Sequence, residues 1–363
     1  MAVKIKKKKM QLDILMDSGA YSAMTKGEVI EIDKYIKFIK DCGTNITEHI
    51  SLDVIGDGAE TYKNWTYMKK KGLNPIPTYH LSTDIKYLER YIKETPYIGI
   101  GGVAGITTSR TARETFNTLW KEVLTDSDGL PLVKIHGMGI TDVAILADFP
   151  FFSIDSSTWL MASRRGIIII PGLDSKEPDY FQAKRVEVSS KSPHRKKRGQ
   201  HLENLGEFQK KMIMDFITEK GFIIGSSHQN EFGETLNKEN GKEDIIERGI
   251  CNDWFPRDCL NVNFFLNLEE RLKEWPWSWP SKKTTYQLQL LSDYDNVDKK
   301  AIMKFPKCRT KIYLAGEGVK EYDIFSYIRG AGFNTYRRML AYPFRKAKVL
   351  KDFNPLFEEM ESE

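Results

Sequence analysis

The chain has 363 residues, of which 40% are hydrophobic, 29% charged and 12% aromatic, and this balance excludes a disordered or fibrous protein. The formal net charge of +5 comes from 55 basic and 50 acidic side chains, so bulk charge barely favours a polyanionic partner. No apolar run approaches the roughly 20 residues that a membrane-spanning helix needs.

Further features of the sequence indicate a cytoplasmic protein with reduced thiols. The N-terminus is basic but is followed by Asp13 and Asp17 instead of an apolar signal core. The four cysteines are widely scattered, which argues against a disulfide framework. Cys251 and Cys259 do not have the C-x2-C spacing of structural zinc sites. We therefore expect no metal and no cofactor, although the spacing alone leaves a metal at these two cysteines open.

Short apolar runs alternate with segments of helical spacing over the first 230 residues. The expected strands are residues 12–16, 50–55, 75–79, 97–100, 132–135, 151–154, 167–170 and 222–224. The expected helices between them include residues 32–40, 61–71, 84–93, 112–124 and 201–219. Strands that alternate with helices pair in parallel, and eight such units predict an α/β fold of the (β/α)8 TIM-barrel type. A doubly wound open sheet is the alternative.

The character of the chain changes beyond residue 230. We expect a barrel catalytic core over residues 1–230, a helical connector over 231–280 and a small basic C-terminal element over 281–363. The last two would form an α-rich accessory lobe, to which the sequence assigns no activity. In the connector, Trp275-Pro-Trp-Ser-Trp-Pro280 is expected to pack against the barrel wall, with a base-stacking platform as the alternative.

Polar residues recur where the expected strands end. In a TIM-type barrel the catalytic groups project from the C-terminal ends of the strands. These ends carry Asp17, Asp53, His80, Gly101, Gly102, His136, Asp155, Gly172 and His228. Each aspartate alone could be a turn or helix-capping residue, and each histidine a hydrogen-bonded core residue. Their recurrence in independent units predicts one shared pocket.

Five motifs in register resemble a known family. They are Asp17-Ser-Gly-Ala-Tyr21, Leu52-Asp53-Val, Ile98-Gly-Ile-Gly-Gly102, His136-Gly-Met-Gly139 and Phe152-Ser-Ile-Asp-Ser-Ser157. Over about residues 12–172 the chain resembles the tRNA-guanine transglycosylase superfamily, and most closely its DpdA-like branch, which inserts 7-deazaguanines into DNA. The resemblance implies a TIM-type barrel that exchanges bases in nucleic acid.

The resemblance also implies roles for individual residues. Asp155 matches the carboxylate that attacks the anomeric carbon of the sugar, and Asp17 matches an aspartate that contacts the base and transfers a proton. Asp53 resembles a second base-reading aspartate. The remaining expected substrate-binding residues, some lining the pocket and some stacking on or contacting the base, are Ser18, Tyr21, His80, Gly101, Gly102, His136, Gly137 and Met138.

The sequence departs from the family pattern in two respects. His80 stands where the tRNA enzymes usually have a glutamine near the end of the third strand. The C-x-C-x2-C zinc motif of those enzymes, with its later histidine, is not reproduced in this sequence. The histidine leads us to expect a base selection different from that of the tRNA enzymes, and the missing zinc motif weakens the assignment of tRNA as the substrate and favours DNA.

The chemistry follows from the carboxylates themselves. Cleavage of an N-glycosidic bond develops positive charge on the sugar and negative charge on the departing base, which a nucleophilic carboxylate and a proton donor would address. The expected function is transglycosylation through a covalent aspartyl-sugar intermediate, with a free 7-deazaguanine-type base as co-substrate. Two alternatives stay open: a DNA glycosylase of anti-phage defence with water as acceptor, and a non-catalytic nucleic-acid-binding protein.

A basic segment follows the seventh expected strand. Its cations are Lys191, Arg195, Lys196, Lys197 and Arg198. A solvated basic loop is the plainer interpretation, and phosphate contact on the active-site face is the functional one. Because a base inside a duplex is inaccessible, the enzyme would have to flip it out or act on single strands.

Overall fold

The computed structural model describes residues 6–102, 109–140, 142–192, 194–195, 201–228, 243–280, 307–315, 337–343 and 356–361. Their contacts divide the chain into two compact units. Unit 1 takes the described residues within Met1–Ser156, Leu272–Glu321 and Thr335–Glu363. Unit 2 takes those within Ser157–Arg271.

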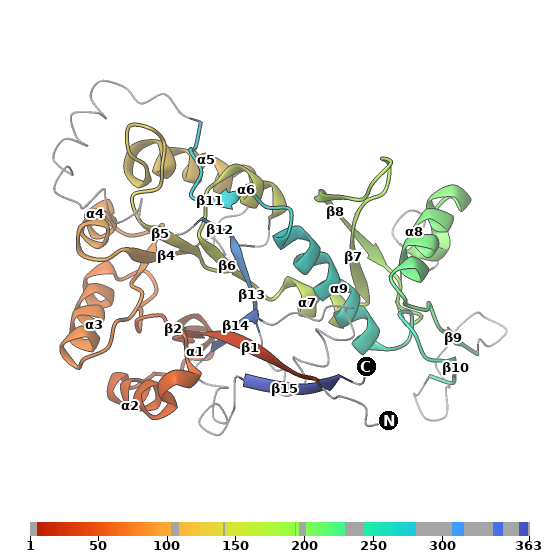
Figure 1. Cartoon of the computed structure of the whole chain (residues 1–363), viewed down its shortest axis with the longest axis horizontal. Coiled ribbons are helices and arrows are strands. Elements are labelled where there is room, and N and C mark those ends of the chain that lie inside the picture. Colours follow the sequence, from red (N-terminus) through yellow and green to blue (C-terminus); the bar gives the residue numbers. More distant parts are fainter. Residues whose placement is uncertain are drawn as a thin grey trace. The chain divides into compact units, whose positions relative to one another are not determined.

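Unit 1 is built on one mixed sheet (Figure 1). Its strands are β1 (Lys6–Asp17), β2 (Glu48–His49), β3 (Thr78–His80), β4 (Tyr97–Gly101), β5 (Lys134–Gly137), β6 (Ser153–Ser156), β13 (Lys311–Ala315), β14 (Arg337–Pro343) and β15 (Leu356–Glu361). Parallel pairing runs in the order β3-β4-β5-β6-β13-β14-β1, and β2 pairs in parallel with β1. β15 alone is antiparallel, on β1. A parallel bridge joins Ile50, after β2, to Ile76, before β3.

Helices connect most of the strands of unit 1. They are α1 (Ala20–Thr25), α2 (Ile32–Cys42), η1 (Gly43–Asn45), α3 (Gly58–Lys70), α4 (Ile85–Glu94), α5 (Ser109–Leu119) with the π-helical turn η3 (Trp120–Leu124), and α6 (Val143–Asp148). Aspartates begin three of them, because the side chains of Asp57, Asp84 and Asp142 accept backbone N–H groups of α3, α4 and α6. Each cap sets the residue at which the chain turns from a strand-end loop into a helix.

The core of unit 1 combines strand residues with the tryptophan segment. Leu15, Ile50, Tyr97, Phe152 and Tyr313 form a buried cluster together with Ile76 and Trp275. The indole of Trp275 donates from Nε1 to the Pro150 carbonyl at 2.9 Å, and Trp279 stacks on Phe149. β11 (Glu274–Trp275) pairs with β12 (Cys308–Arg309) beside this cluster. The expected packing role of the segment is confirmed for Trp275 and Trp279, which are buried and not free to stack on a base.

Unit 2 is smaller and differs in topology. Its elements are α7 (Thr158–Arg164), β7 (Ile167–Gly172), β8 (Asp179–Glu187), η4 (Leu202–Asn204), α8 (Glu207–Glu219), β9 (Ser226–Ser227), β10 (Ile245–Glu247) and α9 (Trp254–Glu269). β7 and β8 form an antiparallel hairpin, and β9 pairs antiparallel with β10. Most residues of α9 are buried, including Cys259, Leu260 and Phe264.

The structure corrects three of the expected strands. Within residues 50–55 only Ile50 forms a bridge, to Ile76, and the strand β2 lies before it. Residues 167–170 do form a strand, but it pairs antiparallel with β8 in unit 2, and residues 222–224 form no strand. In the parallel sheet the neighbours of β6 and β1 are instead β13 and β14. The boundary expected at residue 230 does not coincide with the division of contacts. Local periodicity identified strands, but pairing partners are set by contacts far apart in the sequence.

The C-terminal segment also differs from the expected α-rich lobe. Its described parts are strands: β12 pairs with β11, and β13, β14 and β15 belong to the main sheet. Among the described residues, no helix is long and apolar enough to cross a membrane.

Candidate active site

Three aspartates gather at one end of the parallel strands. Asp17 is the last residue of β1, Asp155 lies in β6, and Asp53 follows the Ile50 bridge. Burial raises the pKa of Asp17 to about 7, with further contributions from the charges of Asp53 and Asp155, against the lowering effect of the Gly19 and Ser18 backbone N–H groups. Asp53 and Asp155 thus each lie close enough to Asp17 to affect its pKa, and about half of the Asp17 side chains carry a proton at pH 7.

Asp53 is held from two sides. Its Oδ1 accepts a hydrogen bond from Ser18 Oγ at 2.6 Å, and its Oδ2 lies 2.8 Å from His80 Nε2. Both side chains are buried, with Asp53 7% and His80 2% exposed. Because Nε2 faces a carboxylate, it carries a proton. The other ring nitrogen, Nδ1, is buried and has no hydrogen-bond partner among the described residues.

Asp155 is bound through one of its two oxygens. Its Oδ1 accepts the Gly139 backbone N–H at 2.6 Å, and His136 Nε2 lies 3.5 Å from the same oxygen. Within the described part of the chain, no group donates to Oδ2. The Asp155 side chain is 23% exposed, so this carboxylate is partly accessible to solvent.

Strand register places a buried polar chain behind Asp155. His136 is paired with Gly99 on one side and with Ser153 on the other. Its Nδ1 lies 2.7 Å from Ser153 Oγ, which lies 2.6 Å from the Tyr97 hydroxyl. Sequence reasoning missed Ser153 and Tyr97. The signal for Ser153 was strand periodicity, because it lies two residues before Asp155 and therefore on the same face of β6.

The glycines divide into two groups. A Cβ at Gly101 would lie 3.4 Å from His80 Cδ2 and 3.7 Å from Met138 Cγ, so Gly101 faces two of the expected site residues. Gly102 has φ +87°, which a residue with a side chain rarely adopts. Gly137, expected to line the pocket, faces the buried side chains of Ile140 and Phe151 instead. Its lack of a side chain is required by packing.

Two tyrosines lie in positions that the sequence did not indicate. Tyr21, expected to stack on a base, lies in α1 with 57% exposure and makes no described contact with the aspartates. Tyr35 in α2, not singled out from the sequence, is fully buried and donates its hydroxyl to the Ile50 carbonyl at 2.8 Å. Burial and the charges of Asp17 and Asp53 hold the pKa of Tyr35 well above its usual value, which places this side chain beside the acidic cluster.

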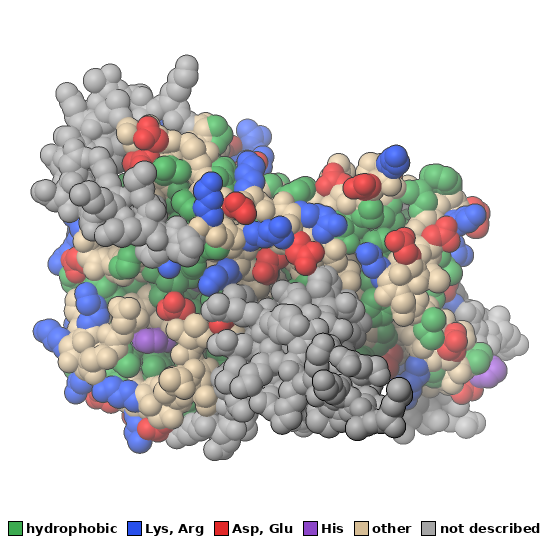
Figure 2. Space-filling view, in the orientation of Figure 1, with side chains coloured by type: hydrophobic (Ala, Val, Ile, Leu, Met, Phe, Trp, Pro, Cys, Tyr) green, Lys and Arg blue, Asp and Glu red, His purple; other side chains and the backbone are tan. Residues whose placement is uncertain are grey.

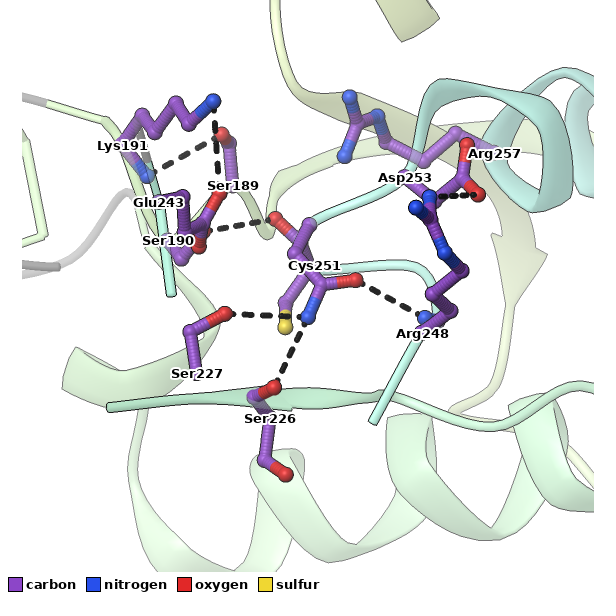
Figure 3. A network of polar contacts seen from close by, with 12 residues as sticks. Ser189, Ser190, Lys191, Ser226, Ser227, Glu243, Arg248, Cys251, Asp253 and Arg257 are labelled. Atoms are coloured by element: carbon purple, nitrogen blue, oxygen red, sulfur yellow. Dashed lines mark hydrogen bonds and ion pairs between the residues drawn. The ribbon is translucent and has the colours of Figure 1, made fainter. Parts of the chain in front are cut away.

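The described cations of the basic segment are already paired. Lys191 Nζ lies 3.4 Å from Glu243 Oε2, and Glu243 also accepts a hydrogen bond from Ser190 Oγ (Figure 3). Arg195 Nε lies 2.7 Å from a carboxylate oxygen of Glu203. The expected residues Lys196, Lys197 and Arg198 lie outside the described residues. On the face drawn in Figure 2, basic and acidic side chains alternate over the described surface and form no single basic field.

The cysteines of unit 2, Cys251 and Cys259, are free thiols. Burial raises the pKa of Cys251 to about 11 and that of Cys259 to about 12. In the part of the chain that is described, no group of three or more histidine, cysteine or acidic side chains is arranged to hold a metal ion.

Comparisons with protein-family models, with curated proteins and with solved structures found no match to this chain. The transglycosylase resemblance therefore rests on the five sequence motifs, and the candidate active site is defined by the geometry of its residues.

Proposed function

We propose that this chain cleaves an N-glycosidic bond in nucleic acid and exchanges the base, with Asp155 as nucleophile and Asp17 as proton donor. The observation that carries the proposal is the environment of Asp17. Asp17 has a pKa of about 7, which the charge of the Asp155 carboxylate helps to raise. The two acidic groups of this cluster can therefore play different roles at neutral pH. Glycosyl chemistry requires such a division between an acid and a nucleophile.

We also propose that the parallel strands of unit 1 close into a TIM-type barrel, and the order in which they pair supports this. β1 pairs with β14 on one side and with β2 on the other, and the Ile50–Ile76 bridge leads from β2 to β3. Followed through β4, β5, β6 and β13, the parallel neighbours return to β14. A doubly wound sheet would instead leave two free edge strands.

In the proposed reaction, Asp155 Oδ2 attacks the anomeric carbon as the bond to the base nitrogen breaks. The bonding electron pair leaves with the base, which takes the proton of Asp17. A second base then attacks the sugar ester from the opposite face, gives its proton to Asp17 and releases Asp155. Two inversions retain the configuration at the sugar.

The substrate in this proposal is DNA, and the incoming group is a free 7-deazaguanine-type base. Asp53 and His80 are the base-reading groups. His80 Nε2 and Ser18 Oγ hold the two Asp53 oxygens, and the unpartnered His80 Nδ1 can accept a hydrogen bond from a base N–H when the ring is neutral.

The test is to incubate DNA with a radiolabelled 7-deazaguanine base and the wild-type chain, Asp155→Asn or Asp215→Asn. Asp215 is an exposed carboxylate on α8 and serves as the matched control. We expect incorporation with wild type and Asp215→Asn, and none with Asp155→Asn. Denaturing gels should show a covalent protein–DNA adduct only with an intact Asp155. Equal incorporation by all three proteins would eliminate the proposed nucleophile.

A second candidate is a DNA glycosylase in which water replaces the incoming base. The favouring observation is His80, whose buried Nδ1 could hold a water molecule. This function predicts abasic sites without added free base, whereas base exchange predicts no change in DNA until a base is supplied. Nucleic-acid binding without either product would leave a non-catalytic binding protein.

A further inference from the structure

A buried chain of three side chains ends at Asp155. The Tyr97 hydroxyl lies 2.6 Å from Ser153 Oγ, and Ser153 Oγ lies 2.7 Å from His136 Nδ1. Tyr97 is 7% exposed, and Ser153 and His136 are completely buried. The far nitrogen of the same ring, Nε2, faces Asp155 Oδ1 at 3.5 Å. The three groups thus connect the interior of unit 1 to the proposed nucleophile.

The hydrogen positions in this chain follow from counting donors and acceptors. Burial raises the pKa of Tyr97 above its usual range, so the phenol keeps its hydrogen. Ser153 Oγ is the acceptor that the described residues offer to this hydrogen. If His136 Nδ1 donated to Ser153 and Ser153 to Tyr97, the phenol hydrogen would be buried without an acceptor, at a cost of about 1–3 kcal/mol. The favoured order is Tyr97 to Ser153 to Nδ1.

We propose that Tyr97 and Ser153 are positioning residues that fix His136 as the tautomer with the hydrogen on Nε2, directed at Asp155 Oδ1. The Oδ1 atom then faces two N–H groups, from Gly139 and His136, while Oδ2 is left unbound as the attacking atom. The 3.5 Å separation is longer than an ordinary hydrogen bond, and such contacts often shorten when substrate binds. The assignment of Oδ2 as the attacking atom rests on the proposed function, whereas the tautomer does not.

The tautomer can be measured without any substrate. Nitrogen-15 NMR of histidine-labelled full-length protein distinguishes the protonated from the unprotonated ring nitrogen, and His136→Gln assigns the signal among the six histidines. We expect the Nε2–H form in wild type. Tyr97→Phe and Ser153→Ala should both alter the His136 signals toward a mixture of forms. Tyr91→Phe is the matched control, because it removes a buried phenol hydroxyl that has no partner among the described residues.

Turnover supplies the second measurement. Removing a group that orients a catalytic residue typically lowers activity by roughly 10- to 100-fold. Tyr97→Phe should therefore lower kcat within this range with little change in KM for DNA, while Tyr91→Phe leaves kcat unchanged. An Nδ1–H tautomer in wild type, or unaltered signals and kcat in both variants, would overturn the inference. If wild type shows no base exchange at all, the proposed function falls, but the NMR result still decides the tautomer.

Discussion

At the scale of single residues, the charge state of Asp17 is the central property of the site. Burial and two neighbouring carboxylates raise the pKa of Asp17 to about 7, so this side chain changes its charge within the range where an enzyme usually works. The same environment destabilises the fold when the proton of Asp17 is lost. The raised pKa of Asp17 therefore leads to two predictions, one for the rate of base exchange and one for the stability of the fold, and both depend on pH.

The first prediction concerns rate. If Asp17 protonates the departing base, base exchange should be constant below about pH 7 and fall about tenfold per pH unit above it. Asp17→Asn should lower the rate by roughly 10²- to 10⁴-fold and remove this dependence. Initial rates measured from pH 5.5 to 9 check the prediction. A rate that rises through pH 7 would instead make Asp17 a base in the slow step.

The second prediction concerns stability. A pKa raised from 3.8 to about 7 means that the folded chain binds this proton more tightly than the unfolded chain does. The stabilisation is complete below pH 4 and is lost as the pH rises to 7. Asp17→Asn, which carries no charge, should gain stability over wild type between pH 4 and 8, by at most about 4 kcal/mol at 1.4 kcal/mol per unit.

Urea unfolding at several pH values measures this difference. Glu122→Gln, which neutralises an exposed carboxylate in unit 1, is the control and should show no such pH-dependent gain. A constant difference between Asp17→Asn and wild type across the range would contradict the raised pKa.

At the scale of elements, unit 2 depends on one buried amide. Asn261 of α9 is completely buried, and its Oδ1 accepts the Ile169 N–H of β7 at 2.7 Å. Its Nδ2 donates to the carbonyls of Trp159 in α7 at 2.8 Å and of Ile167 at 3.3 Å. One side chain thus joins a helix, a strand and a second helix.

The third prediction follows from these contacts. Asn261→Ala removes the acceptor of the Ile169 N–H and the donor to two carbonyls, so it should destabilise unit 2 by about 3 kcal/mol. Hydrogen exchange of peptides from β7 and α9, read by mass spectrometry, should show the loss of protection. Asn267→Ala removes an amide whose described hydrogen bonds reach only Asn263 and Arg271, one turn away on either side, and should change exchange little. Equal effects of the two variants would refute the special role of Asn261.

At the scale of the whole molecule, the sheet that carries the site is completed by the end of the chain. β13 pairs with β6 along residues that include Asp155, and β14 and β15 flank β1. The Thr310 hydroxyl and the Lys311 N–H bind the carbonyls of Phe151 and Phe152. The strands bearing Asp17 and Asp155 are therefore held by residues beyond 307.

The fourth prediction is that a fragment of residues 1–230 does not fold. It lacks the partners of β1 and β6 in unit 1 and the whole of α9 in unit 2. Exposed strand edges and apolar surface should make it aggregate and leave it open to proteolysis. Thermal melting followed by circular dichroism compares it with the full chain. Cooperative melting of the fragment would show that the first 230 residues are an independent domain.

The sequence by itself identified most of the strand segments in the first 156 residues and placed Asp17 and Asp155 at strand ends, although residues 51–55, which include Asp53, form no strand. That much is local, because strands read as short apolar runs and functional groups follow where the runs end. Only the tertiary structure decided that residues 167–170 leave the parallel sheet, that β13 and β14 join it, and that Ser153 and Tyr97 stand behind His136. Strand order and the burial that raises the pKa of Asp17 depend on contacts between residues far apart in the chain, and no local pattern records such contacts.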